Sequence, residues 1–235
     1  MDKIKVKKLP KECFDVFNSY KFTPYYINKS KSKFKSHLES GKASPKEIND
    51  YIYSKFQKKI TSKKRYDFLK KENIGIDCSG FVSYILNAYS QKKINKNIYD
   101  IIKKTTLNPF RYFISYKFTP IKSKLNSETL TNNINTIKID KINDIRPGDL
   151  IRMNGGAHIA IISEIEYKGK NVSKIKYWQS TEKKGVCESE IIIKNVKLPL
   201  KDQYWKDING ALYKPLYLFK KKINSNGIRR LKLLQ

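Results

Sequence analysis

A change of hydrophobic period near Pro147 limits most strongly how this chain can fold. Before it, apolar residues recur about every four positions, as at Ile48, Ile52 and Phe56, which predicts helices with one buried face. After it, apolar and polar residues alternate between turn-forming segments. We predict strands near 149–154, 158–167, 173–181, 188–196 and 210–218. Helices followed by strands predict an α+β fold in which N-terminal helices pack on an antiparallel sheet.

Two helix starts can be placed from local signals. The segment 44–47 combines an N-cap serine, a first-turn proline and a capping-box glutamate, and it predicts a helix over about 45–60. A second predicted helix runs from Cys78 to about Ala88. A helix start carries unpaired N–H groups and the positive end of the helix dipole, which lower the pKa of a thiol. Cys78 is therefore a candidate nucleophile, and the alternative is a buried cysteine that packs as a small hydrophobe.

The length of 235 residues suits one ordinary domain or a domain with an appended segment. We predict a helical N-terminal extension over 1–62 and a main domain over 63–220. An insertion at about 92–140 carries an aromatic patch from Phe110 to Phe118. Residues 221–235 are predicted to form a solvated basic tail that contains Arg229 and Arg230.

The chain is strongly basic, with 50 Lys and Arg against 21 Asp and Glu and a formal net charge of +29. Such a charge favours polyanions such as nucleic acid, teichoic acid or an anionic membrane surface. No recognisable nucleic-acid module accompanies it, so no specific nucleic-acid partner is expected. No apolar run reaches the roughly 20 residues of a transmembrane helix, and none is expected.

The first residues carry charge but no apolar core of a signal peptide, so we expect a cytoplasmic protein or export by a non-classical route. Three widely spaced cysteines fit neither a disulfide framework nor a CxxC metal site. Two histidines exclude a metal site built on several imidazoles. We therefore predict no metal and no cofactor.

His158 opens an alternating apolar run, where a strand end can project the imidazole over a cleft. If residues 168 and 169 form a two-residue hairpin turn, His158 lies directly opposite Gln179 on the next strand. The amide oxygen of Gln179 then accepts the imidazole N–H, fixes its tautomer and directs the other nitrogen toward Cys78. A structural histidine at a strand end is the alternative, and a slip of one residue would turn Gln179 away.

Three blocks in this order resemble the NlpC family of papain-like cysteine peptidases, which cleave peptide stems of bacterial peptidoglycan. They are Asp-Cys-Ser-Gly-Phe-Val at 77–82, Pro-Gly-Asp-Leu at 147–150 and His-Ile-Ala-Ile at 158–161. The resemblance covers roughly residues 60–218. It implies a papain-like fold with the nucleophile at a helix N-terminus.

The resemblance also implies the roles of six residues. Cys78 would be the nucleophile, His158 the general base and Gln179 the polar residue that orients the histidine. Tyr66, twelve residues before Cys78, would contribute to the substrate cleft and the oxyanion region. Asp77 and Ser79 would line the site for the free amine and backbone of the substrate.

The chain departs from the family pattern in ways that bear on the substrate. The third residue is most often His, whereas Gln179 cannot carry charge. The separation of Cys78 and His158 is longer than in compact members, so the insertion is expected to cap the groove. The implied partner is peptidoglycan or its peptide fragments, with anionic wall polymer bound through the basic surface. Alternatives are a papain-like hydrolase or acyltransferase acting on lipid or protein amides, and an inactive polyanion-binding scaffold.

Overall fold

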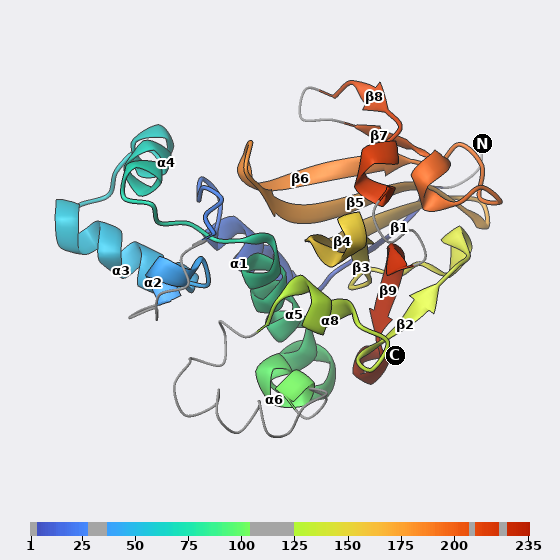
Figure 1. The fold of residues 1–235 in the computed structure, drawn as a ribbon, viewed down its shortest axis with the longest axis horizontal. Helices are drawn as coiled ribbons and strands as arrows, with labels where there is room; N and C mark the ends of the chain where they lie inside the picture. The colour runs from blue at the N-terminus through green and yellow to red at the C-terminus, as the bar shows by residue number, and fades with distance from the viewer. Residues whose placement is uncertain (1–3, 28–36, 104–124, 207–209, 221–224) are drawn as a thin grey trace. The chain divides into compact units, whose positions relative to one another are not determined.

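The computed structural model describes residues 4–27, 37–103, 125–206, 210–220 and 225–235 (Figure 1). The chain divides into two compact units that are each discontinuous in sequence. The sheet unit comprises Met1–Lys11, Ser127–Gln179 and Glu188–Gln235. The helical unit comprises Glu12–Asn126 and Ser180–Cys187. The predicted boundaries at 62 and 220 do not coincide with either unit, and the aromatic patch of the insertion lies outside the described residues.

Helices and antiparallel strands are both present, which confirms the predicted α+β class. The α-helices are α1 (Lys11–Ser19), α2 (His37–Ser40), α3 (Pro45–Phe56), α4 (Ser62–Lys71), α5 (Cys78–Ile94), α6 (Ile98–Lys103) and α8 (Ser127–Thr131). The strands are β1 (Ile4–Lys8), β2 (Thr136–Ile139), β3 (Leu150–Met153), β4 (His158–Lys168), β5 (Asn171–Thr181), β6 (Gly185–Ile192), β7 (Tyr204–Lys206), β8 (Leu212–Tyr213) and β9 (Gly227–Leu231). Short 3-10 turns lie at Ile142–Asp144, Asn154–Gly156, Leu200–Asp202, Leu216–Phe219 and Lys232–Leu234.

The strands form one sheet in the order β2-β9-β3-β4-β5-β6-β7-β8, and β1 pairs with β4. The strand β4 is buried along most of its length, which explains its continuous run of isoleucine and alanine after His158. Its side chains Ala160, Ile162 and Ile165 join a core of aliphatic and aromatic residues from other strands, including Ile151, Ile175, Tyr177 and Trp205. This core fixes the position of β4 and therefore of the histidine at its leading end.

The segment Ile4–Lys8 forms strand β1, although the first 62 residues were predicted to be helical. It pairs antiparallel with the second half of β4, with Val6 opposite Glu166 and Lys8 opposite Glu164. The Lys8 ammonium lies 2.9 Å from the Glu164 carboxylate. Alternating β-branched residues and this charge match favour a strand over an isolated helix turn.

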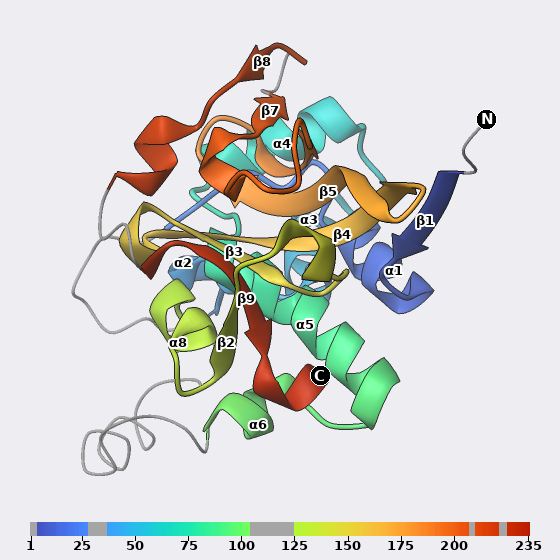
Figure 2. The same cartoon turned by 90° about the vertical axis from the view of Figure 1, so that its right-hand side faces the viewer.

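The predicted basic tail is wrong, because residues 227–231 form β9 between β2 and β3 (Figure 2). Leu150 pairs with Arg229, and Ile137 pairs with Arg230. Arg230 is 9% exposed and binds Asp149 through both carboxylate oxygens. The run of basic residues suggested solvation, but each buried guanidinium has polar partners from a distant part of the chain.

In the helical unit, α3 begins with the predicted capping box. The Ser44 hydroxyl accepts from the Glu47 N–H, and the Glu47 carboxylate accepts from the Ser44 N–H. It ends at Phe56, four residues before the predicted end, because Gln57 adopts a left-handed conformation with φ 52°. The following helix α4 packs on α3 through the Phe56 and Phe68 rings, whose centroids lie 4.8 Å apart. Among the described helices, none is long and apolar enough to cross a membrane.

The helix α5 is the centre of the helical unit. Its buried residue Phe81 contacts Phe17 of α1 and Tyr20 edge to face, with centroid distances of 6.3 and 5.8 Å. Tyr20 is itself fully buried and donates to the Ala43 carbonyl at 2.7 Å. These contacts hold the first turns of α5 and hence the position of Cys78.

Candidate functional site

The start of α5 has the predicted geometry. Asp77 is the N-cap, with extended backbone and a side chain that accepts from the Gly80 N–H at 2.6 Å. Cys78 is consequently the first residue of the helix, where backbone N–H groups lack partners within the helix. The residue is a thiol with 6% of its surface exposed.

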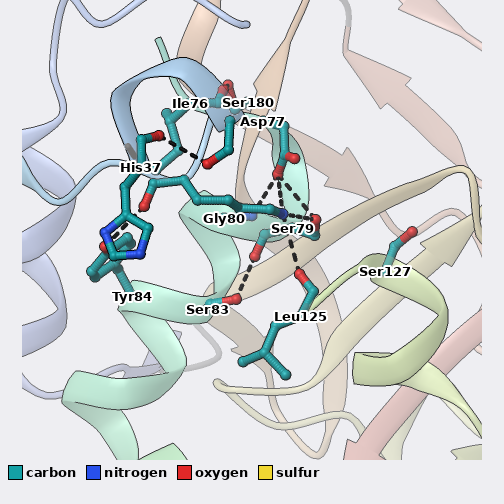
Figure 3. A network of polar contacts seen from close by, with 12 residues as sticks. His37, Ile76, Asp77, Ser79, Gly80, Ser83, Tyr84, Leu125, Ser127 and Ser180 are labelled. Carbon is teal, nitrogen blue, oxygen red and sulfur yellow. Dashed lines mark hydrogen bonds and ion pairs between the residues drawn. The ribbon is translucent and has the colours of Figure 1, made fainter. Parts of the chain in front are cut away.

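The side chains of Asp77 and Ser79, labelled in Figure 3, both accept hydrogen bonds from Lys42, a buried lysine that no sequence motif indicated. The Lys42 ammonium donates to Asp77 Oδ1 at 2.8 Å, to Ser79 Oγ at 2.5 Å and to the Leu125 carbonyl at 3.1 Å. Asp77 and Ser79 were expected to line the site for the free amine and backbone of the substrate. In the structure both are 5% exposed and serve an internal ammonium, because a buried carboxylate requires a counter-ion.

Tyr25 is a tyrosine that interacts electrostatically with Cys78. Burial raises the pKa of the Tyr25 hydroxyl, and negative charge on Cys78 and Asp77 raises it further. The phenol is therefore protonated at neutral pH and can donate a hydrogen bond. Tyr66, the residue expected in this position, belongs to α4, which lies well apart from the start of α5 (Figure 1). Tyr66 was predicted from its spacing before Cys78. Tyr25 lies in the segment after α1, where no sequence motif indicated a role for it.

The second group of candidate residues lies in the sheet unit. His158 Nε2 is 2.8 Å from Gln179 Oε1, so the imidazole donates from Nε2 and leaves Nδ1 as the basic nitrogen. The amide of Gln179 donates in turn to Ser189 Oγ at 3.0 Å on β6. The expected hydrogen bond between His158 and Gln179 is therefore present, and Ser189 is an additional partner that no sequence signal indicated.

The observed register of β4 and β5 differs from the register that was predicted for this pair. The turn is formed by residues 169 and 170, with Gly169 at φ 61°, and Lys168 pairs with Asn171. Because the turn lies one residue later than predicted, every pair shifts by two, and the two irregularities along β4 and β5 offset each other. Ile161 therefore lies opposite Trp178, which places Gln179 opposite position 160 rather than His158. The prediction of direct opposition was wrong by two residues. An even shift preserves the face, so the two side chains still meet diagonally.

The His158 ring is held in its neutral form. Burial lowers the pKa of His158, and the hydrogen bond to Gln179 acts in the opposite direction. A neutral imidazole with Nε2 protonated can accept a proton at Nδ1 and return it later, as a general base requires.

The other cysteines and histidine have different surroundings. Cys13 is fully buried, its Sγ lies 3.7 Å from the Ile85 carbonyl, and burial raises its pKa to about 12. Cys187 is half-buried. His37 is partly buried and lies 2.9 Å from the Glu47 carboxylate. Within the part of the chain that the structure describes, no group of three His, Cys, Asp or Glu residues is placed to hold a metal ion.

The structure thus gathers the predicted residues into two groups. Asp77, Cys78 and Ser79 lie together in the helical unit, and His158 and Gln179 lie together in the sheet unit. Comparison with protein-family models, curated proteins and solved structures gave no match to this chain. The function of this chain is therefore inferred from the chemistry of these two groups.

Proposed function

We propose that the protein is a papain-like thiol hydrolase of the NlpC type, in which Cys78, His158 and Gln179 act together on amide bonds in peptidoglycan stem peptides. The observation that carries the proposal is the 2.8 Å bond from His158 Nε2 to Gln179 Oε1. It fixes the one tautomer in which Nδ1 can take a proton from a thiol. Cysteine peptidases use a cysteine at a helix N-terminus as nucleophile, a histidine as base and a polar residue that orients the histidine. Cys78, His158 and Gln179 match these three roles.

The chain also connects the two groups covalently. Gln179 is followed directly by Ser180, whose hydroxyl donates to the Ile76 carbonyl at 2.7 Å, two residues before Cys78 (Figure 3). The strand that carries the orienting glutamine thus continues into a residue bound beside the nucleophile. This connection supports a joint role for Cys78, His158 and Gln179.

The proposed reaction proceeds in two stages. His158 Nδ1 accepts the thiol proton, and the Cys78 sulfur forms a bond to the carbonyl carbon of the substrate. The N–H groups of the first turn of α5 and the Tyr25 hydroxyl donate to the oxyanion. The C–N bond then breaks as His158 returns its proton to the leaving amine. Water, deprotonated by the same imidazole, hydrolyses the thioester and releases the carboxylate product.

Defined muropeptides with mass analysis of the products test this function. We expect cleavage by the wild-type protein and no cleavage by Cys78→Ala or His158→Ala. Cys187→Ala is the matched control, because it removes a half-buried thiol that has no proposed role. Full cleavage by Cys78→Ala would refute the mechanism.

The net charge of +29 favours a second candidate, in which the same residues act on lipid or protein amides at an anionic surface. Products from anionic lipid esters, without products from muropeptides, would support that candidate. A polyanion-binding scaffold without catalysis predicts no enhanced thiol reactivity. Stoichiometric alkylation of Cys78 by iodoacetamide at pH 6 would argue against a scaffold.

A further inference from the structure

The contacts of Lys42 form a closed network at the first turn of α5. All three protons of the ammonium have acceptors, namely Asp77 Oδ1, Ser79 Oγ and the Leu125 carbonyl. The lysine is 5% exposed, and its ion pair with Asp77 is almost wholly removed from solvent. A lysine is rarely buried unless it is paired, so this position has a specific electrostatic role.

The backbone around Lys42 is equally fixed. Lys42 pairs with Ile76 in an isolated β-bridge, and its carbonyl accepts from the Tyr84 hydroxyl at 3.0 Å. The Gly41 carbonyl accepts from the Asp77 N–H at 2.9 Å. A Cβ at Gly80 would lie 2.9 Å from Lys42 Cδ, so the glycine of the Cys-Ser-Gly block makes room for the lysine stem. The ammonium therefore cannot move away from Asp77 without a change in the start of the helix.

The charge balance at this turn bears directly on the thiol. Asp77 directly precedes Cys78 in the chain, and a nearby carboxylate opposes a second negative charge on sulfur. The Lys42 ammonium, 2.8 Å from Asp77 Oδ1, cancels this opposition. The start of the helix can then stabilise the thiolate as well as it would if the N-cap residue were uncharged. Asp77 still accepts the hydrogen bond from the Gly80 N–H. Among the described residues, Tyr25 is a further titratable group that interacts with Cys78 and Asp77, and Tyr25 also interacts with Glu182.

We propose that Lys42 is a positioning residue that keeps the thiolate form of Cys78 populated at neutral pH by neutralising the charge of Asp77. This inference rests on the proposed role of Cys78 as nucleophile. Its test uses alkylation, which requires no turnover, so it can fail while the hydrolase activity stands, and the activity can be absent while the alkylation behaves as expected.

The experiment measures the pH dependence of alkylation of each cysteine by iodoacetamide in the full chain. Trypsin separates the three thiols into the peptides 12–21, 72–92 and 185–194, so mass analysis reads Cys78 alone. Lys42→Met should slow the reaction of Cys78 at pH 7 about tenfold. Lys42→Arg should retain the wild-type profile. Lys46→Met is the control, because Lys46 pairs with Asp50 at the surface of the same unit.

Two further variants separate an electrostatic role from a structural one. Asp77→Asn keeps a good N-cap residue and leaves the lysine charge unopposed, so alkylation of Cys78 at pH 7 should become faster. Adding Asp77→Asn to Lys42→Met should restore the rate that Lys42→Met loses. If Asp77→Asn leaves the profile unchanged or slows the reaction, or if the double variant stays as slow as Lys42→Met, the inference is overturned. Asp77→Asn decides the question even if Lys42→Met does not fold.

Discussion

Replacement of Arg230 by methionine would remove the cation that joins β9 to the start of β3. Arg230 donates from Nε to Asp149 Oδ1 at 2.7 Å, and from Nη2 to Asp149 Oδ2 at 2.8 Å and the Asp144 carbonyl at 2.6 Å. Methionine keeps an apolar stem but has no donor. Asp149, which is 1% exposed, would retain the bond from the Arg146 N–H at 2.8 Å.

The expected cost follows from the loss of two of the three described bonds to that carboxylate. Removing one partner of a buried ion pair costs about 3–5 kcal/mol, a large part of the 5–15 kcal/mol typical of a whole domain. Burial already raises the pKa of Asp149, although Arg230 and Arg146 act to lower it. A raised folded-state pKa makes stability greatest at low pH and reduces it as the pH rises through that value. The deficit of the variant should therefore be smaller at pH 4 than at pH 7.

Urea unfolding followed by tryptophan fluorescence measures this effect in the sheet unit alone. The two tryptophans of the chain, Trp178 and Trp205, both belong to that unit and are fully buried. Lys232→Met, at an exposed position just after β9, is the control and should change the free energy of unfolding by less than about 0.5 kcal/mol. Arg230→Met combined with Asp149→Asn should recover part of the loss. A cost below about 1 kcal/mol for Arg230→Met would refute the assigned role of β9.

Three further predictions concern the candidate site. Tyr25→Phe should lower the rate of amide hydrolysis about a hundredfold and more than Tyr66→Phe does, which steady-state rates would check; the reverse order would restore Tyr66 as the donor. Gln179→Leu should lower the pKa of His158, because it removes the bond that raises it, and NMR titration of the two imidazoles would show this. Because burial lowers the pKa of His158, the free energy of unfolding should decrease as the pH falls below about 6.5. His158→Gln should weaken that dependence in urea titrations at several pH values, and an unchanged slope would contradict it.

Local signals in the sequence predicted the elements that bear the candidate residues. The N-cap before Cys78 and the apolar run after His158 each lie within a few residues of the feature they define. The pairing of His158 with Gln179 was reached through a register that was wrong by two, because the sequence did not distinguish a turn at 168–169 from one at 169–170. His158 and Gln179 still lie on the same face of the sheet, because a register shift of two residues is even.

Long-range contacts were not predictable in the same way. Lys42 is one of many lysines, and only its neighbours Asp77 and Ser79, more than thirty positions away, distinguish it. Arg230 likewise looked like part of a solvated run until Asp149 supplied its partner. A single sequence shows which residue types are present, but a buried charge is recognised only when the folded chain brings its counter-ion to it.

The central place of β9 has a consequence for the order in which the sheet assembles. Leu150 and its partner Arg229 are separated by 79 positions (229 − 150), whereas β4 and β5 are joined by a tight turn. The cost of closing so long a loop delays that pairing, so β3 spends the early stage of refolding with an open edge. Such an edge can capture another chain, and refolding yield should therefore fall as protein concentration rises.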